Sequence, residues 1–195
     1  MRLIIAAVGR LKDAERDLYD RYAKRFDAAG RSLKLGPIEL NEITESRAAT
    51  ADLRKADEAE RLIKAASAAE VRLILDEKGS ALSSQDIANL LATQRDAGNA
   101  ALAVMIGGPD GHGEAALRGA TLKVSLGAIT LPHGLARIVL TEQLYRAATI
   151  LSAHPYHRAC RRPGTPWADP PFPPGRDQRP PHGGPTPGHR VHIPR

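Results

Sequence analysis

Short apolar segments alternate with amphipathic segments along the first 158 residues, and this alternation limits the fold more than any other feature of the chain. The clearest apolar segments are "RLIIAAV" (2–8), "VRLILDE" (71–77) and "ALAVMIGG" (101–108), each as long as a strand buried on both faces. Further strands are predicted at 33–43, where the pattern is less regular, and at 122–128. Helices are predicted at 13–28, 50–67, 83–97, 114–119 and 135–153. The pattern indicates an α/β fold, with a parallel-rich sheet and helices on both faces.

The predicted helices carry periodic and capping signals. Leu18, Tyr22 and Phe26 recur at every fourth position of the first helix, which places them on one face. Ser83 or Ser84 stands at the start of the third helix and is a typical N-cap residue. These segments are therefore expected to be amphipathic helices that cover the sheet.

Length and composition narrow the class of protein. The 195 residues provide enough chain for one α/β domain and an appended segment. The longest apolar runs are far shorter than the roughly 20 residues of a membrane span, and the start shows no signal-peptide cleavage pattern. The single cysteine, Cys160, cannot form an intramolecular disulfide or a four-cysteine metal site. We therefore expect a cytoplasmic protein with no metal and no membrane association.

The chain changes character at residue 159. Residues 159–195 hold 11 prolines and few aliphatic side chains, so they cannot bury enough apolar surface to offset the entropy of ordering. They also carry most of the excess positive charge, with a net charge of +4 against +2 for residues 1–158. We predict one domain over 1–158 and a disordered Pro/Arg/Gly-rich tail over 159–195. A frameshifted reading of a GC-rich gene would produce this composition, and a genuine flexible extension is the alternative.

Three loops are candidate ligand sites, because ligands of parallel α/β sheets bind beyond the carboxyl ends of the strands. They are "LDEKG" (75–79), "IGGPDGHG" (106–113) and "SLGAITLPHG" (125–134). The paired glycines of the second loop either let a ligand approach the backbone or only form a tight turn. Their order does not match the dinucleotide motif G-x-G-x-x-G, and no G-x-x-x-x-G-K-[ST] is present, so a pyrophosphate site is not predicted.

Two further features follow the last predicted strand. In "LPHG" (131–134), Pro132 keeps Leu131 extended, and loop backbone groups without ladder partners can hydrogen-bond the edge of a planar ligand such as adenine. The motif "HPYHR" (154–158) follows the last helix and has two histidines three residues apart. Without a neighbouring carboxylate or thiolate they do not complete a metal site. They are interpreted as helix-end histidines or as substrate contacts.

The segments "VMIGGPDGHG", "SLGAITLPHGLARIVLTEQLYRA" and "HPYHR", together with "AAVG" and "LILDEKG", resemble the RlmH family of SPOUT methyltransferases over residues 1–158. The resemblance implies that S-adenosyl-L-methionine is used to methylate N3 of a pseudouridine in 23S rRNA within the ribosome. It also implies a homodimer and a C-terminal trefoil knot in which the chain from about Leu131 is threaded through an earlier loop. By motif, the cofactor contacts would be Leu75, Gly108, Gly127, Ala128, Ile129, Thr130, Leu131 and Pro132.

The reaction implied by this resemblance needs an in-line approach of the ring nitrogen and removal of its proton. His133 or a histidine of the last motif would accept the proton, Arg137 or Arg158 would hold a phosphate or an oxyanion, and Tyr156 would stack on a base. The candidate catalytic residues are His133, Arg137, Glu142, His154, Tyr156, His157 and Arg158. The sequence alone does not identify which of these residues is the general base.

Two other hypotheses are kept beside the methyltransferase. One is a non-catalytic RNA-binding or ribosome-binding protein with the same fold, and the other is a nucleotide-binding enzyme of the doubly wound type. Binding of S-adenosylmethionine as opposed to a nucleoside triphosphate separates the two enzymes. RNA binding without methyl transfer would indicate the binding protein.

Overall fold

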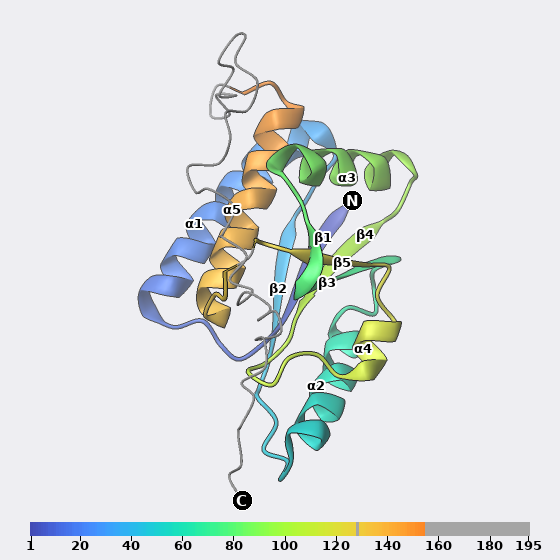
Figure 1. The fold of residues 1–195 in the computed structure, drawn as a ribbon. Helices are drawn as coiled ribbons and strands as arrows, with labels where there is room; N and C mark the ends of the chain where they lie inside the picture. Colours follow the sequence, from blue (N-terminus) through green and yellow to red (C-terminus); the bar gives the residue numbers. More distant parts are fainter. Residues whose placement is uncertain (128, 155–195) are drawn as a thin grey trace, which may run out of the picture. The chain divides into compact units, whose positions relative to one another are not determined.

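The computed structural model describes residues 1–127 and 129–154, and within them a five-stranded sheet is covered by helices on both faces (Figure 1). The strands are β1 (Arg2–Val8), β2 (Ile38–Ile43), β3 (Val71–Ala81), β4 (Ala101–Ile106) and β5 (Leu122–Ser125). The α-helices are α1 (Asp13–Gly30), α2 (Ala51–Ala65), α3 (Ser84–Asp96), α4 (Glu114–Arg118) and α5 (His133–Leu151). A single 3₁₀ turn, η1 (Arg31–Leu33), follows α1. The predicted α/β class with a parallel sheet is confirmed.

The strand order is β2-β1-β4-β3-β5, and all four pairings are parallel. In β1, for example, Leu3 is paired with Ile38 of β2 on one side and with Leu102 of β4 on the other. Because the strands are parallel, their carboxyl ends all lie at one edge of the sheet. The loops that follow them are therefore brought together in space.

The two faces of the sheet pack against different helices. Leu3 and Ile5 of β1 belong to the core formed with α1, α3 and α5, whereas Ile4 and Ala6 belong to the core formed with α2 and α4. This follows from the two-residue period of a strand, which sends successive side chains to opposite faces. All four side chains are almost fully buried.

Helix starts follow the capping residues of the sequence. Ser83 accepts a hydrogen bond from the backbone N–H of Asp86, and the Asp86 carboxylate accepts one from the backbone N–H of Ser83, which completes a capping box. Thr50 caps α2 by accepting a bond from the N–H of Leu53. Of the two predicted caps of α3, the structure has Ser83.

The strand predicted at 33–43 begins only at Ile38. Residues 31–33 form η1, and Lys34 adopts a left-handed conformation with φ of 58°. Leu35 is nevertheless buried in the core that includes α1. The alternation of apolar residues that suggested a strand here is therefore produced by a turn. The predicted start of this strand was wrong.

Strand β3 extends beyond its predicted end and contains an irregularity. Both Leu75 and Ser80 are paired with Val124 of β5, so the residues between them project out of the ladder. A Cβ atom at Gly79 would lie 2.6 Å from the backbone of Val124, which explains why glycine stands where the strand returns. The projecting residues 76–78 form part of the candidate site.

Candidate functional site

The three loops singled out in the sequence surround one cavity at the carboxyl edge of the sheet. Its volume is about 510 Å³. The first loop supplies Leu75 to Lys78, the second Ile106 to His112, and the third Ser125 to Gly127 and Ile129 to Leu131, while His133 and Ala136 belong to α5. The wall thus combines aliphatic side chains, charged side chains and glycines.

The glycine loop is a tight turn and a cavity wall at once. The N–H of Gly111 donates to the carbonyl oxygen of Gly108 at 2.9 Å, which closes a turn with Pro109 and Asp110 at its centre. A Cβ atom at Gly107 would lie 2.9 Å from the carbonyl oxygen of Gly111, so the close return of the chain requires glycine there. The tight turn considered for these glycines is therefore present, and the approach of a ligand to their backbone stays a prediction.

His112 connects β3 with the loop that follows β4. Its Nε2 lies 2.9 Å from the carbonyl oxygen of Leu75 and 3.3 Å from the backbone nitrogen of Gly107. Burial lowers the pKa of His112, and its Nδ1 is buried with no hydrogen-bond partner among the described residues. The ring is therefore neutral at pH 7, and a proton on Nε2 would be donated to Leu75.

The third loop begins with a hydrogen-bonded turn. The hydroxyl of Ser125 accepts from the N–H of Gly127 at 3.2 Å and lies 3.0 Å from the carbonyl oxygen of the same residue. Gly127 has φ of +122°, a conformation that other residues rarely adopt. The loop ends at Pro132, after which α5 begins at His133.

A family model for a predicted SPOUT methyltransferase matches residues 1–157. The chain belongs to the SPOUT methyltransferase family. It is 51% identical over 160 residues to the ribosomal RNA large subunit methyltransferase H of Xanthobacter autotrophicus and 49% identical to that of Brucella anthropi. Both alignments cover 82% of this chain and 100% of the relative. The resemblance drawn from the sequence motifs is thus confirmed.

Two solved structures are also similar to this SPOUT methyltransferase. A probable methylase family protein from Haemophilus influenzae Rd KW20 aligns with a TM-score of 0.47 and 11% identity, over 81% of this chain and 70% of that one. The SpoU methyltransferase AviRb from Streptomyces viridochromogenes, solved with AdoMet, aligns with a TM-score of 0.37 and 17% identity, over 78% and 61% of the two chains.

Most residues predicted to contact the cofactor lie at the cavity. Those that line it are Leu75, Gly108, Gly127, Ile129, Thr130 and Leu131. Pro132 is not one of the lining residues and serves as the N-cap of α5, while Ala128 lies outside the described residues. A Cβ atom at Gly108 would lie 2.6 Å from Oε2 of the buried Glu58, so a larger side chain there would meet α2.

The predicted catalytic residues fall into three groups. His133 lines the cavity. Arg137, Glu142 and His154 are described and are not lining residues. The remaining three, Tyr156, His157 and Arg158, lie outside the described residues.

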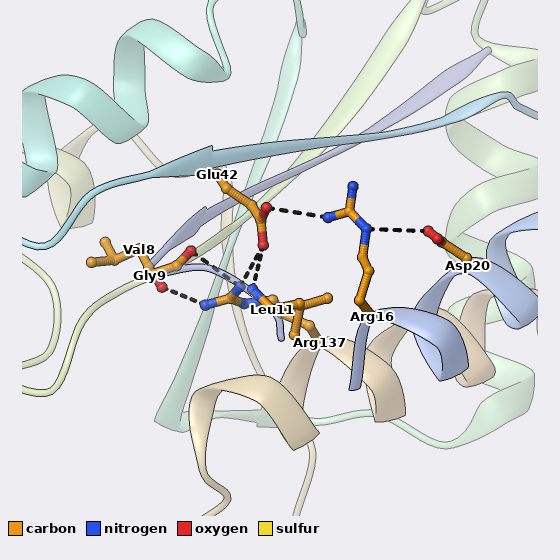
Figure 2. Close-up of polar contacts among 7 residues, drawn as sticks. All are labelled: Val8, Gly9, Leu11, Arg16, Asp20, Glu42 and Arg137. Atoms are coloured by element: carbon orange, nitrogen blue, oxygen red, sulfur yellow. Dashed lines mark hydrogen bonds and ion pairs between the residues drawn. The ribbon is translucent and has the colours of Figure 1, made fainter. Parts of the chain in front are cut away.

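Arg137 of this SPOUT methyltransferase is held by the protein itself (Figure 2). Its side chain is 2% exposed and donates to the carbonyl oxygens of Val8 and Gly9 at the end of β1. It also donates to Oε1 of Glu42 at 3.1 Å. Glu42 in turn accepts from the N–H of Leu11 and from Arg16. Arg137 thereby ties the first turns of α5 to the ends of two strands.

Glu142 and His154 also have protein partners. Glu142 pairs with Arg146 one turn further along α5 and accepts a bond from Gln143 at 2.6 Å. His154 lies three residues beyond the last residue of α5, Leu151, is exposed, and donates its backbone N–H to Thr149.

Several residues that line the cavity were not predicted as site residues from the sequence, chiefly Asp76, Glu77, Lys78, Asp110 and His112. All five stand within the loops that it did select. Their position at the end of an apolar run, or in the turn that follows one, was the available signal. The sequence does not show which side chains of a loop turn inward.

The described residues contain no group of three or more His, Cys, Asp or Glu side chains that could hold a metal ion. Of the helices in the described part of the chain, none is both long enough and apolar enough to cross a membrane.

Proposed function

We propose that this SPOUT methyltransferase transfers a methyl group from S-adenosylmethionine to N3 of a pseudouridine in 23S rRNA within the ribosome. The observation that carries the proposal is the convergence of the irregular part of β3 and two strand-end loops on one cavity, in a chain that matches the family model over residues 1–157. Curated relatives that align over their full length are named ribosomal RNA large subunit methyltransferase H.

The cavity suits S-adenosylmethionine in size and lining. Its volume of about 510 Å³ is within the usual range of small-molecule sites. Leu75, Ile106 and Leu131 offer apolar surface for an adenine ring, and the carboxylates of Asp76 and Glu77 are suited to accept hydrogen bonds from ribose hydroxyls. When bound, this cofactor supplies an electrophilic methyl group. We retain the eight predicted contacts, including Ala128 and Pro132, as the proposed cofactor residues.

The protein must orient the pseudouridine and accept its N3 proton. His133 is the described candidate that lines the cavity, and we assign it the role of base. His154 and His157 are the alternatives. Tyr156 and Arg158 are proposed to contact the RNA, by stacking on a base and by holding a phosphate. Arg137 is assigned to positioning α5, because its guanidinium group is bound to Glu42 and to two backbone carbonyl groups.

Family membership also supports a cytoplasmic homodimer with a trefoil knot, in which the chain from about Leu131 passes through an earlier loop. The apolar side chains of α5 give this assembly little support, because most of them face the core. Ile138, Leu144 and Ala148 are buried in the core between α1 and α3, whereas Leu135 is 44% exposed. Leu135 and the 68% exposed Ile129 are the apolar surface that we propose for the partner subunit.

We further propose that residues 1–158 form the methyltransferase domain and that 159–195 are not needed for it. The family match ends at residue 157. Because the net charge of residues 1–158 is only +2, electrostatic attraction to RNA is weak, and recognition is proposed to require a structured ribosomal target.

The test is methyl transfer to ribosomes from a strain that lacks this methyltransferase. Purified protein and methyl-labelled S-adenosylmethionine should label 23S rRNA at one nucleotide, and mass spectrometry of nuclease fragments should place the methyl group on N3 of a pseudouridine. A labelled methyl group at any other nucleotide would refute the assignment of N3 of a pseudouridine as the target. Binding to ribosomes without transfer would instead support a non-catalytic RNA-binding protein.

A further inference from the structure

Helix α2 holds the glycine turn through a forked ion pair. Nε of Arg54 lies 2.7 Å from Oδ2 of Asp110, and its NH2 group lies 3.2 Å from Oδ1. The remaining NH1 group donates to the carbonyl oxygen of Ala48 at 3.2 Å. The guanidinium group therefore joins α2, the loop that precedes it and the turn at the cavity. A two-bond fork also fixes the orientation of the carboxylate, which a single bond would not.

Two more contacts of α2 support the same turn. The buried Glu58 accepts a hydrogen bond from the N–H of Ser46 with Oε1 and lies against Gly108 with Oε2. At the end of the loop, a Cβ atom on Gly113 would lie 2.3 Å from the carbonyl oxygen of Lys55. The loop therefore lies on α2 at both ends, and the Arg54–Asp110 pair holds its middle.

The carboxylate of Asp110 is engaged by this pair although the residue lines the cavity. The hydrogen bond from Arg54 lowers the pKa of Asp110 below its ordinary value. Asp110 is therefore ionised at neutral pH, and both of its oxygens are directed to Arg54. This arrangement is suited to fixing the turn and not to accepting a proton from a substrate.

We propose that Arg54 and Asp110 are positioning residues for cofactor binding, which hold the glycine turn in the shape that the cofactor requires. The inference rests on the proposed function, because it takes S-adenosylmethionine as the ligand of the cavity. Neither residue was singled out from the sequence, and they are 56 positions apart.

The test is a double-mutant cycle with Arg54→Ala, Asp110→Ala and the double variant, read by calorimetric titration with S-adenosylmethionine. Each single variant should raise the Kd by about two- to fivefold, as expected from the strength of an exposed ion pair. The double variant should bind no more weakly than Arg54→Ala alone, because the loss of Arg54 already releases its contact with Asp110. In methyl transfer, KM for the cofactor should rise while kcat at saturating cofactor stays unchanged.

Arg61→Ala is the matched control. Arg61 is also on α2, has nearly the same exposure as Arg54 (32% and 31%), and pairs with Asp57 at 2.7 Å without lining the cavity. It should leave the Kd unchanged. The inference is overturned if Arg54→Ala binds the cofactor as wild type does, if Arg61→Ala weakens binding equally, or if the two single effects simply add. Failure of the wild-type protein to bind S-adenosylmethionine would instead refute the proposed function.

Discussion

Replacing Arg137 by methionine tests whether this buried arginine is structural. Methionine fills a similar volume, so the change removes the charge and three hydrogen-bond partners without opening a large cavity. Removing one partner of a buried ion pair generally costs about 3 to 5 kcal/mol. Here Glu42 keeps its bonds to Arg16 and to the N–H of Leu11, so its carboxylate still has two hydrogen-bond partners. We therefore expect a loss near the lower limit, about 3 kcal/mol.

The assay is urea unfolding followed by circular dichroism, with Arg16→Ala as the control. Arg16 also pairs with Glu42, but its side chain is 46% exposed, so its removal should cost less than about 1 kcal/mol. A loss of about 3 kcal/mol in a domain of this size corresponds to a fall in Tm of roughly 6 to 12 °C. A stable Arg137→Met protein that binds cofactor normally but transfers no methyl group would refute the structural assignment and make Arg137 catalytic.

Three further outcomes are expected. Because burial lowers the pKa of His112, the stability contributed by its neutral ring is present above the ordinary histidine pKa of about 6.5 and is lost as the pH falls below it. Between pH 7.5 and pH 5.5 the wild-type protein should therefore lose more of its free energy of unfolding than His112→Gln does. Equal losses in the two proteins would contradict this. Gly108→Ala should be destabilised by about 1 to 3 kcal/mol, because its Cβ would lie 2.6 Å from Oε2 of Glu58, and an unchanged urea midpoint would argue against this packing. A chain that ends at Arg158 should keep the Tm and cofactor affinity of the full chain, and its methyl transfer should rise or stay unchanged; a large loss of activity would show that residues 159–195 are functional.

The sequence predicted the elements well because their signals are local. The run at 2–8 forms β1 with the predicted bounds, and Ser83 caps α3 as expected. The start of β2 was misplaced because a buried residue such as Leu35 satisfies an alternating pattern in a turn as well as in a strand. Local patterns identify the type of an element more reliably than they identify its ends.

The site was predictable as a set of loops but not as a set of side-chain contacts. Parallel strands bring their carboxyl ends together, so the three loops could be chosen from the strand pattern alone. The pairs that hold them link distant parts of the chain, as Arg137 does with Glu42 across 95 positions. Such pairs depend on how helices pack on the sheet, and no spacing in the sequence indicates them. The apolar face of α5 likewise packs mostly against α1, α3 and the sheet, and its sequence pattern alone does not distinguish such a core contact from a subunit interface.

The distribution of the cavity wall along the chain has a consequence for biosynthesis. Its residues extend from Leu75 to Ala136, and the last of them belong to the helix that Arg137 anchors to the end of β1. A growing chain can form β1 to β4 before the third loop and α5 have been made, but the pocket does not exist until that helix has docked. Contacts between such distant segments form slowly because a long loop must first be closed. Newly made protein should therefore acquire cofactor affinity late, after most of its sheet is in place.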